Sequence, residues 1–158
     1  VVEQTPLVDV AEALAADADL MPAYSFRRGD PEATIAASGN RLEGEMRIGG
    51  QEHFYLEGQA ALVVPEEDGT FLIHSSTQHP SEVQHVVARV LGLPDAAVEV
   101  AVRRMGGGFG GKESQASGWA AMAALAARVT GRPAKIRLDR DDDFVMTGKR
   151  HVFLVGYS

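Results

Sequence analysis

The sequence contains no cysteine. Without thiols, these 158 residues cannot supply a disulfide bond, a thiolate nucleophile, a Cys-ligated zinc site or thiolate ligands for an iron–sulfur cluster. Any redox chemistry in this part of the chain therefore depends on a bound cofactor.

Basic residues are few, and long apolar runs are missing. Lys and Arg number 15 against 22 Asp and Glu, so the formal net charge is −7 and no cationic surface is expected for binding phosphates. No stretch approaches the roughly 20 apolar residues of a membrane-spanning helix, and the first residues lack the pattern of a signal peptide. We therefore expect a cytoplasmic protein with no nucleic-acid partner and no membrane partner.

The local patterns predict an α+β fold, with a mixed sheet and packed helices. Its composition, 45% hydrophobic and 23% charged, is that of an ordinary globular domain. A short helix or an ordered connector is expected at residues 8–19, and helices are expected at residues 31–38, 80–91 and 113–129. Strands are expected at residues 41–48, 60–64, 71–74, 98–102, 134–138 and 151–158. The chain does not begin with Met and its last predicted strand lacks an obvious neighbour, so we expect a part of a longer protein.

Four local details accompany these elements. Asp30 should cap the helix over 31–38, and Ser81 with Gln84 should form a capping box for the helix over 80–91. One face of that second helix should be apolar, through Val83, Val86, Val87, Val90 and Leu91. The acidic run 139–143 is expected to be a capped turn that is either solvated or faces a neighbouring domain.

A glycine-rich loop lies between a predicted strand and a predicted helix. Five of the six residues from Gly106 to Gly111 are glycine, which suits a close backbone approach to a ligand, although a tight turn without ligand is the plain alternative. Gly106, Gly111 and Lys112 fit the phosphate-loop spacing, but Glu113 stands where that motif needs a hydroxyl. A dinucleotide fingerprint, G-x-G-x-x-G, also fits but lacks its acidic residue about 20 positions on. A nucleotide- or phosphate-binding module that uses Gly106–Lys112 remains the alternative function.

Four longer motifs occur in a fixed order along the chain. They are GGQEHFYLEGQ (49–59), STQHPSEVQH (76–85), MGGGFGGKE (105–113) and GRPAKIRLDRDDDFVMTGKRH (131–151). Together they closely resemble the molybdenum-binding subunit of the xanthine dehydrogenase family, which includes xanthine oxidase and aldehyde oxidase. The resemblance implies that residues 1–29 are a connector from a preceding domain. Residues 30–158 would then be the first part of a molybdenum cofactor-binding domain.

The resemblance also implies a chemistry. Members of this family carry molybdenum on molybdopterin, and a metal hydroxide attacks an electron-poor carbon while hydride passes to a sulfido ligand. The implied activity is oxidation of purines, hypoxanthine and xanthine, to urate. Iron–sulfur clusters and FAD would lie on other domains or subunits. The family's general base and a substrate-orienting arginine lie downstream of the matched region, so we expect these residues alone to be catalytically silent.

Five residues match the family's site. Gln51 matches a glutamine that hydrogen-bonds a molybdenum oxygen; by itself it would be interpreted as an ordinary hydrogen bond at a strand end. Gly108, Phe109 and Gly110 match the loop beside the cofactor, where Phe109 contacts the molybdenum ligands. Glu113 matches the catalytic acid that binds the purine and favours charge developing in the transition state. Without the resemblance, Glu113 would be a solvated acid in the first turn of a helix.

Overall fold

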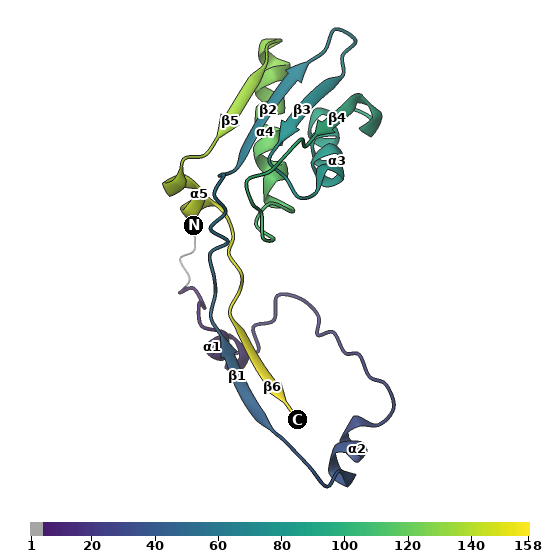
Figure 1. The fold of residues 1–158 in the computed structure, drawn as a ribbon, viewed down its shortest axis with the longest axis vertical. Helices are drawn as coiled ribbons and strands as arrows, with labels where there is room; N and C mark the ends of the chain where they lie inside the picture. The colour runs from purple at the N-terminus through teal and green to yellow at the C-terminus, as the bar shows by residue number, and fades with distance from the viewer. Residues whose placement is uncertain (1–4) are drawn as a thin grey trace. The chain divides into compact units, whose positions relative to one another are not determined.

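The computed structural model describes residues 5–158 (Figure 1). Residues 1–4, the start of the predicted connector, lie outside the described residues. The chain divides into two compact units: the first unit is the chain up to Gln51 together with His151–Ser158, and the second unit is Glu52–Arg150. Within residues 5–158, no helix has the length and apolar character needed to cross a membrane.

The first unit contains two short helices, and each begins after an aspartate. α1 (Val10–Ala15) follows Asp9, whose carboxylate accepts hydrogen bonds from two first-turn N–H groups. α2 (Pro31–Ala37) follows Asp30, whose carboxylate accepts one such bond. Pro31 occupies the first helical position, where the missing N–H costs nothing. Both helices lie where the sequence predicts them, and the predicted Asp30 cap is confirmed.

The first unit also contains a two-stranded antiparallel ribbon. β1 (Gly44–Ile48) pairs with β6 (Phe153–Tyr157), and Gly44 lies opposite Tyr157. A Cβ atom at Gly44 would lie 2.8 Å from Cζ of the Tyr157 ring, so a larger residue there would have to displace the end of the Tyr157 side chain. The predicted C-terminal strand therefore pairs with a strand of this same chain.

The second unit is built on a four-stranded sheet with the order β4-β3-β2-β5 (Figure 1). β2 (Ala60–Pro65) and β3 (Phe71–Ser75) form an antiparallel hairpin. β5 (Ala134–Arg137) pairs antiparallel with β2, whereas β4 (Val98–Ala101) pairs parallel with β3. Because both pairings occur in one sheet, the predicted α+β fold with a mixed sheet is confirmed.

Two helices cover one face of this sheet. α3 (Pro80–Leu91) and a short 3₁₀ helix, η1 (Asp95–Ala97), connect β3 to β4, and α4 (Gln115–Thr130) connects β4 to β5. α3 and α4 pack against each other and against the strands. The buried side of α4 is almost entirely alanine, which lets the helix lie close to the sheet. The core includes Ala61, Val63, Phe71, Ile73, Val83, Val87, Leu91, Val98, Ala120, Ala124 and Ala127.

The predicted capping box of α3 is wrong. The helix begins at Pro80 after His79, and no side chain caps it. Proline at the first helical position moves the start of the helix ahead of Ser81, which therefore cannot act as the cap. Gln84 instead donates to the carbonyl oxygens of Asp95 and Val98 and so holds the start of β4. The predicted apolar face is also narrower than expected, because Val90 is 44% exposed.

Two further expectations need correction near the end of the second unit. α4 begins at Gln115, so Glu113 lies in the turn before the helix and not in its first turn. The acidic run is not only a solvated turn, because it continues into α5 (Arg140–Met146). Asp139 caps this helix as expected, but Asp143 is 1% exposed. Its burial follows from tertiary hydrogen bonds that local patterning does not reveal.

Candidate functional site

The glycine loop connects β4 to α4 and has an unusual backbone. Gly107 and Gly110 have φ values of +95° and +92°, and Phe109 has φ +53°. A positive φ in a bulky residue is uncommon and costs free energy, of order 1–3 kcal/mol, which surrounding contacts must offset. The Phe109 side chain is nevertheless 74% exposed. The contacts that hold this conformation therefore come from the backbone around Phe109, not from burial of its ring.

Three glycines of the loop face the body of the second unit. A Cβ atom at Gly106 would lie 2.6 Å from Cβ of Glu57, and one at Gly111 would lie 2.7 Å from Cε1 of Tyr55. A Cβ atom at Gly108 would collide with the amide group of Gln78. The contacts at Gly106 and Gly111 leave no room for a side chain, so packing requires glycine at these two positions. A side chain at Gly108 would have to displace the end of the Gln78 side chain.

Gly110 differs from these three glycines. The nearest atom to a Cβ placed on it is Nε2 of His53, at 3.8 Å, so there is space around this residue. Gly110 and Phe109 are both exposed, whereas Gly108 and Gly111 are buried. The loop therefore has a packed inner face and an open outer face, where backbone without side chains borders the exposed Phe109 ring. This open backbone cradle fits a large cofactor that approaches the main chain closely.

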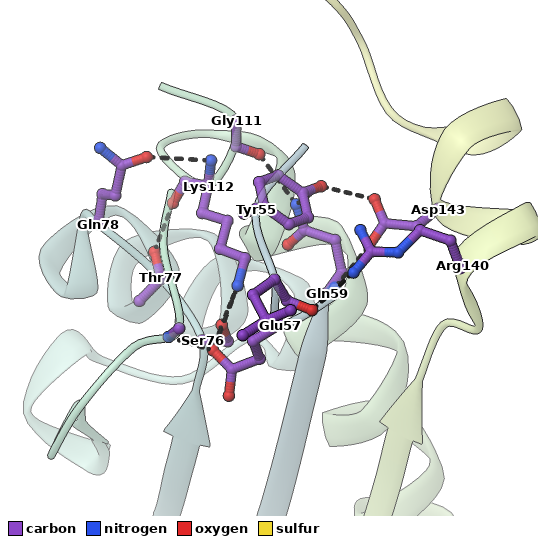
Figure 2. Close-up of polar contacts among 12 residues, drawn as sticks. Tyr55, Glu57, Gln59, Ser76, Thr77, Gln78, Gly111, Lys112, Arg140 and Asp143 are labelled. Carbon is purple, nitrogen blue, oxygen red and sulfur yellow. Dashed lines mark hydrogen bonds and ion pairs between the residues drawn. The ribbon is translucent and has the colours of Figure 1, made fainter. Parts of the chain in front are cut away.

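The residues that follow β3 hold the loop in place (Figure 2). Oε1 of Gln78 accepts hydrogen bonds from the N–H groups of Gly110, at 2.9 Å, and Lys112, at 3.2 Å. The carbonyl oxygen of Lys112 accepts from the Gln78 N–H, at 2.8 Å, and from the Thr77 hydroxyl, at 3.0 Å. Gln78 therefore sets the backbone of the loop on the side next to Phe109.

Sequence reasoning missed Gln78. The residue lies in the motif STQHPSEVQH, a few residues after a predicted strand. Its place in this motif is the only feature of the sequence that indicates a functional role. Nothing in the local pattern indicates that its amide reaches a loop in a different part of the chain. The contact depends on the parallel pairing of β3 with β4, which brings the ends of these strands together.

Lys112 points into the protein and not toward the open face of the loop. Its side chain is 0% exposed, and its Nζ donates to Oγ of Ser76 at 2.6 Å and to Oε2 of Glu57 at 3.2 Å (Figure 2). The same ammonium lies 4.6 Å from the centre of the Tyr55 ring. A lysine held in this way cannot reach a phosphate on the outer face. The alternative of a phosphate-binding loop that uses Lys112 is therefore wrong.

The environment shifts the ionisation of both members of this pair. Burial lowers the pKa of Lys112, and the hydrogen bond and charge of Glu57 offset this only in part. Burial tends to raise the pKa of Glu57, but hydrogen bonds from Ser76, the Gly106 N–H and Lys112 outweigh it and hold the pKa below its ordinary value. Both shifts follow from bringing a charged pair together at a site that is only partly open to water.

A second buried network lies beside the end of the loop (Figure 2). The Tyr55 hydroxyl donates to Oδ1 of Asp143 at 2.5 Å, and the Gln59 N–H donates to Oδ2 at 2.7 Å. The Gln59 amide nitrogen donates to the Tyr55 hydroxyl at 3.0 Å and to the carbonyl oxygen of Gly111 at 2.9 Å. Burial, followed by the hydrogen bond to Asp143, raises the pKa of Tyr55. These bonds link α5 to the last glycine of the loop.

The predicted site residues are distributed as follows. Gly108, Phe109 and Gly110 lie together in the loop, and Glu113 is exposed just beyond its end. Gln51 is exposed and belongs to the first unit, whereas the loop belongs to the second. The functional roles of all five residues stay predictions.

Comparisons with known proteins identify the family. Residues 15–158 match the model of the molybdopterin cofactor-binding domain. The chain belongs to this family. The resemblance inferred from the four motifs is therefore confirmed, and molybdopterin is the cofactor of the domain.

Similar proteins are much longer than this molybdopterin cofactor-binding domain. A xanthine dehydrogenase/oxidase of Gallus gallus is 44% identical over 157 residues, which are 99% of this chain and 12% of that protein. A xanthine dehydrogenase of Drosophila pseudoobscura pseudoobscura is 44% identical over 158 residues, again 99% and 12%. The chain thus spans about 12% of the length of these curated relatives.

Solved structures of oxidoreductases share the fold. The aldehyde oxidoreductase from Desulfovibrio gigas matches with a TM-score of 0.67 and 29% identity, over 78% of this chain and 14% of that chain. A CO dehydrogenase from Oligotropha carboxidovorans matches with a TM-score of 0.65 and 27% identity, over 78% and 16%. The relatives are therefore oxidoreductases of more than one substrate class.

Proposed function

We propose that this chain forms one wall of the molybdenum site of a xanthine dehydrogenase-like enzyme that oxidises purines. The observation that carries the proposal is the glycine loop, whose inner face is packed and whose outer face presents open backbone beside the exposed Phe109. The likeness to xanthine dehydrogenases, at 44% identity, supports a purine as the substrate.

The loop residues would hold the cofactor through backbone and ring contacts. Phe109 and Gly110 border the open face, so their main chain can approach a ligand without steric hindrance from side chains, whereas the buried Gly108 would contribute by letting the loop lie against Gln78. When bound, the molybdenum cofactor supplies the redox chemistry that this cysteine-free chain lacks. The protein's part is to orient cofactor and substrate and to place hydrogen-bond donors where charge develops.

Two glutamines are candidates for the residue that hydrogen-bonds a molybdenum oxygen. Gln51 is the one predicted from the family motif. Gln78 is a second candidate, because its Oε1 already binds two N–H groups of the loop and its amide nitrogen has no hydrogen-bond partner among residues 5–158. An amide N–H can donate to such an oxygen without adding charge.

Glu113 is proposed to bind the purine. It is exposed at the end of the glycine loop, two residues before the first residue of α4. A carboxyl group there can hydrogen-bond a purine ring and favour charge that develops during the reaction. Glu113 would be the catalytic acid of this part of the site, and the general base would come from residues beyond this chain.

The wider organisation is also a proposal. Electrons would leave through iron–sulfur clusters and FAD on other domains or subunits, since this chain has no cysteine for such clusters. Residues 1–29 would connect to a preceding domain, and residues 30–158 would be the first part of the cofactor-binding domain. We also propose a cytoplasmic location for the parent enzyme.

The first test is the molybdenum content of the full-length protein, purified from its own source and measured by elemental mass spectrometry. Near-stoichiometric molybdenum supports the proposal. Absence of molybdenum from folded protein that was made where the cofactor is available would overturn it.

Substitutions then assign the residues. Glu113→Ala should lower xanthine turnover while molybdenum content stays the same, and Glu67→Ala, an exposed acid in the β2–β3 turn, serves as the matched control. Xanthine turnover of Gln51→Ala and Gln78→Ala, compared at equal molybdenum content, shows which of the two glutamines the reaction needs. Equal turnover in Glu113→Ala and Glu67→Ala would exclude a role for Glu113 in purine oxidation.

A further inference from the structure

We propose that Lys112 is a positioning residue, which fixes the start of the glycine loop through Glu57 and so holds Phe109 and Gly110 against the cofactor. The link to the cofactor rests on the proposed function. The effect of Lys112 on the loop itself does not, and it can be measured separately.

Glu57 holds Gly106 from two sides. The Glu57 N–H donates to the carbonyl oxygen of Gly106 at 3.1 Å, and the Gly106 N–H donates to Oε2 of Glu57 at 2.9 Å. The Cβ of Glu57 also lies where a side chain at Gly106 would be. The position of the Glu57 carboxylate therefore determines where the loop begins.

Lys112 determines the position of that carboxylate. Oε2 of Glu57 accepts from three donors: the Gly106 N–H, the Ser76 hydroxyl at 2.6 Å and the Lys112 ammonium at 3.2 Å. Lys112 is also the last residue of the loop, and Gln78 holds its backbone. The ion pair thus connects the two ends of the loop, Gly106 and Lys112, through one carboxylate oxygen.

The two charges differ in their access to water. The side chain of Lys112 is 0% exposed, whereas that of Glu57 is 44% exposed. If Lys112 is replaced, water can still solvate the carboxylate, so the fold should survive with a less restrained loop. If Glu57 is replaced, the buried ammonium keeps only Ser76 and the face of Tyr55 as partners, which should be more damaging.

The test uses hydrogen exchange of the full-length protein. Lys112→Met removes the charge and keeps an unbranched side chain of similar length. Exchange is measured for the Gly106 N–H, which bonds to Glu57, and for the Gln59 N–H, which bonds to Asp143 and not to this pair. We expect about tenfold faster exchange at Gly106, as for the loss of one charge-assisted hydrogen bond, and little change at Gln59. Lys135→Met, an exposed lysine on β5, is the matched control and should change neither.

A double substitution tests whether Lys112 acts through Glu57. Glu57→Gln alone should disturb the loop more than Lys112→Met does, because it leaves the ammonium unpaired. Lys112→Met combined with Glu57→Gln removes that ammonium, and the new amide oxygen can still accept from Gly106. Exchange at Gly106 should therefore be slower in the double variant than in Glu57→Gln alone.

Catalytic measurements then link the loop to function. In Lys112→Met, kcat for xanthine should fall about tenfold with little change in KM, at unchanged molybdenum content, since misplacement of the loop acts on the reacting geometry. Unchanged exchange at Gly106 in folded Lys112→Met overturns the positioning role. Failure of both the single and double variants to fold, while Lys135→Met folds, also overturns it. Absence of molybdenum from the unmodified protein would instead contradict the proposed function and leave the exchange result unaffected.

Discussion

Asp143→Ala should loosen the contact between α5 and the glycine loop. The carboxylate is buried and accepts from the Tyr55 hydroxyl and the Gln59 N–H, both of which are buried as well. The substitution leaves these two donors without an acceptor, and each unpaired buried donor costs about 1–3 kcal/mol. Thr147 loses little, because its hydroxyl also donates to the backbone carbonyl of residue 143. We therefore expect a loss of about 3 kcal/mol in local stability.

Native-state hydrogen exchange of the full-length protein measures this loss. A change of about 3 kcal/mol corresponds to exchange that is roughly 150-fold faster for peptides covering 55–59 and 140–147. Asp141→Ala is the control on the same helix, since Asp141 is exposed, and it should cost no more than about 0.5 kcal/mol. If Asp143→Ala accelerates exchange no more than Asp141→Ala, the buried network does not stabilise this region and the reasoning is refuted.

Three further predictions concern the loop itself. Gly108→Ala should displace the Gln78 amide and speed hydrogen exchange at the Gly110 N–H. Gly118→Ala, at a helix position with open space, should instead stabilise α4 by about 0.5–1 kcal/mol. Equal effects of the two substitutions on exchange at Gly110 would contradict the close contact between Gly108 and Gln78. Glu57 has a pKa below its ordinary value of 4.5, so its stabilising contribution is present above pH 4.5 and is lost as the pH falls through its folded pKa. The unfolding free energies of the unmodified protein and of Glu57→Gln should therefore converge as the pH falls below 4.5. A difference between the two free energies that does not change with pH would contradict a stabilising role for the Glu57 charge. Lys112→Glu should prevent the loop from forming, because it would place a second carboxylate at a buried position next to that of Glu57. Hydrogen exchange at the Gly106 N–H that is as slow as in the unmodified protein would contradict this prediction.

Local signals predicted most of the elements correctly. Asp30 and Pro31 mark the start of α2, and Gly92 ends α3 in the left-handed conformation that glycine adopts readily. Residues 66–70 join β2 and β3, as a short turn between two apolar strands should. These features depend on residues close together in sequence, so a local pattern contains the information that determines them.

Predictions that required tertiary contacts were less successful. Ser81 and Gln84 have the right spacing for a capping box, but Gln84 bonds to carbonyl groups of the segment that leads into β4. Asp143 looks like a surface acid in an acidic run, yet its partners are on the distant segment that includes Tyr55. A polar residue is buried when donors from elsewhere in the chain satisfy it, and sequence spacing does not reveal such donors.

The sequence by itself determined most of the secondary structure, the mixed α+β class and the family, because turns, most cap residues and four ordered motifs are local and specific. It also predicted that the glycine loop belongs to the functional site. Only the tertiary structure decided how the loop is used. Parallel pairing of β3 with β4 brings Gln78 against the loop, and folding of the segment before β2 places Glu57 beside Gly106. Lys112 therefore faces inward as an ion-pair partner, while Phe109 and Gly110 stay exposed.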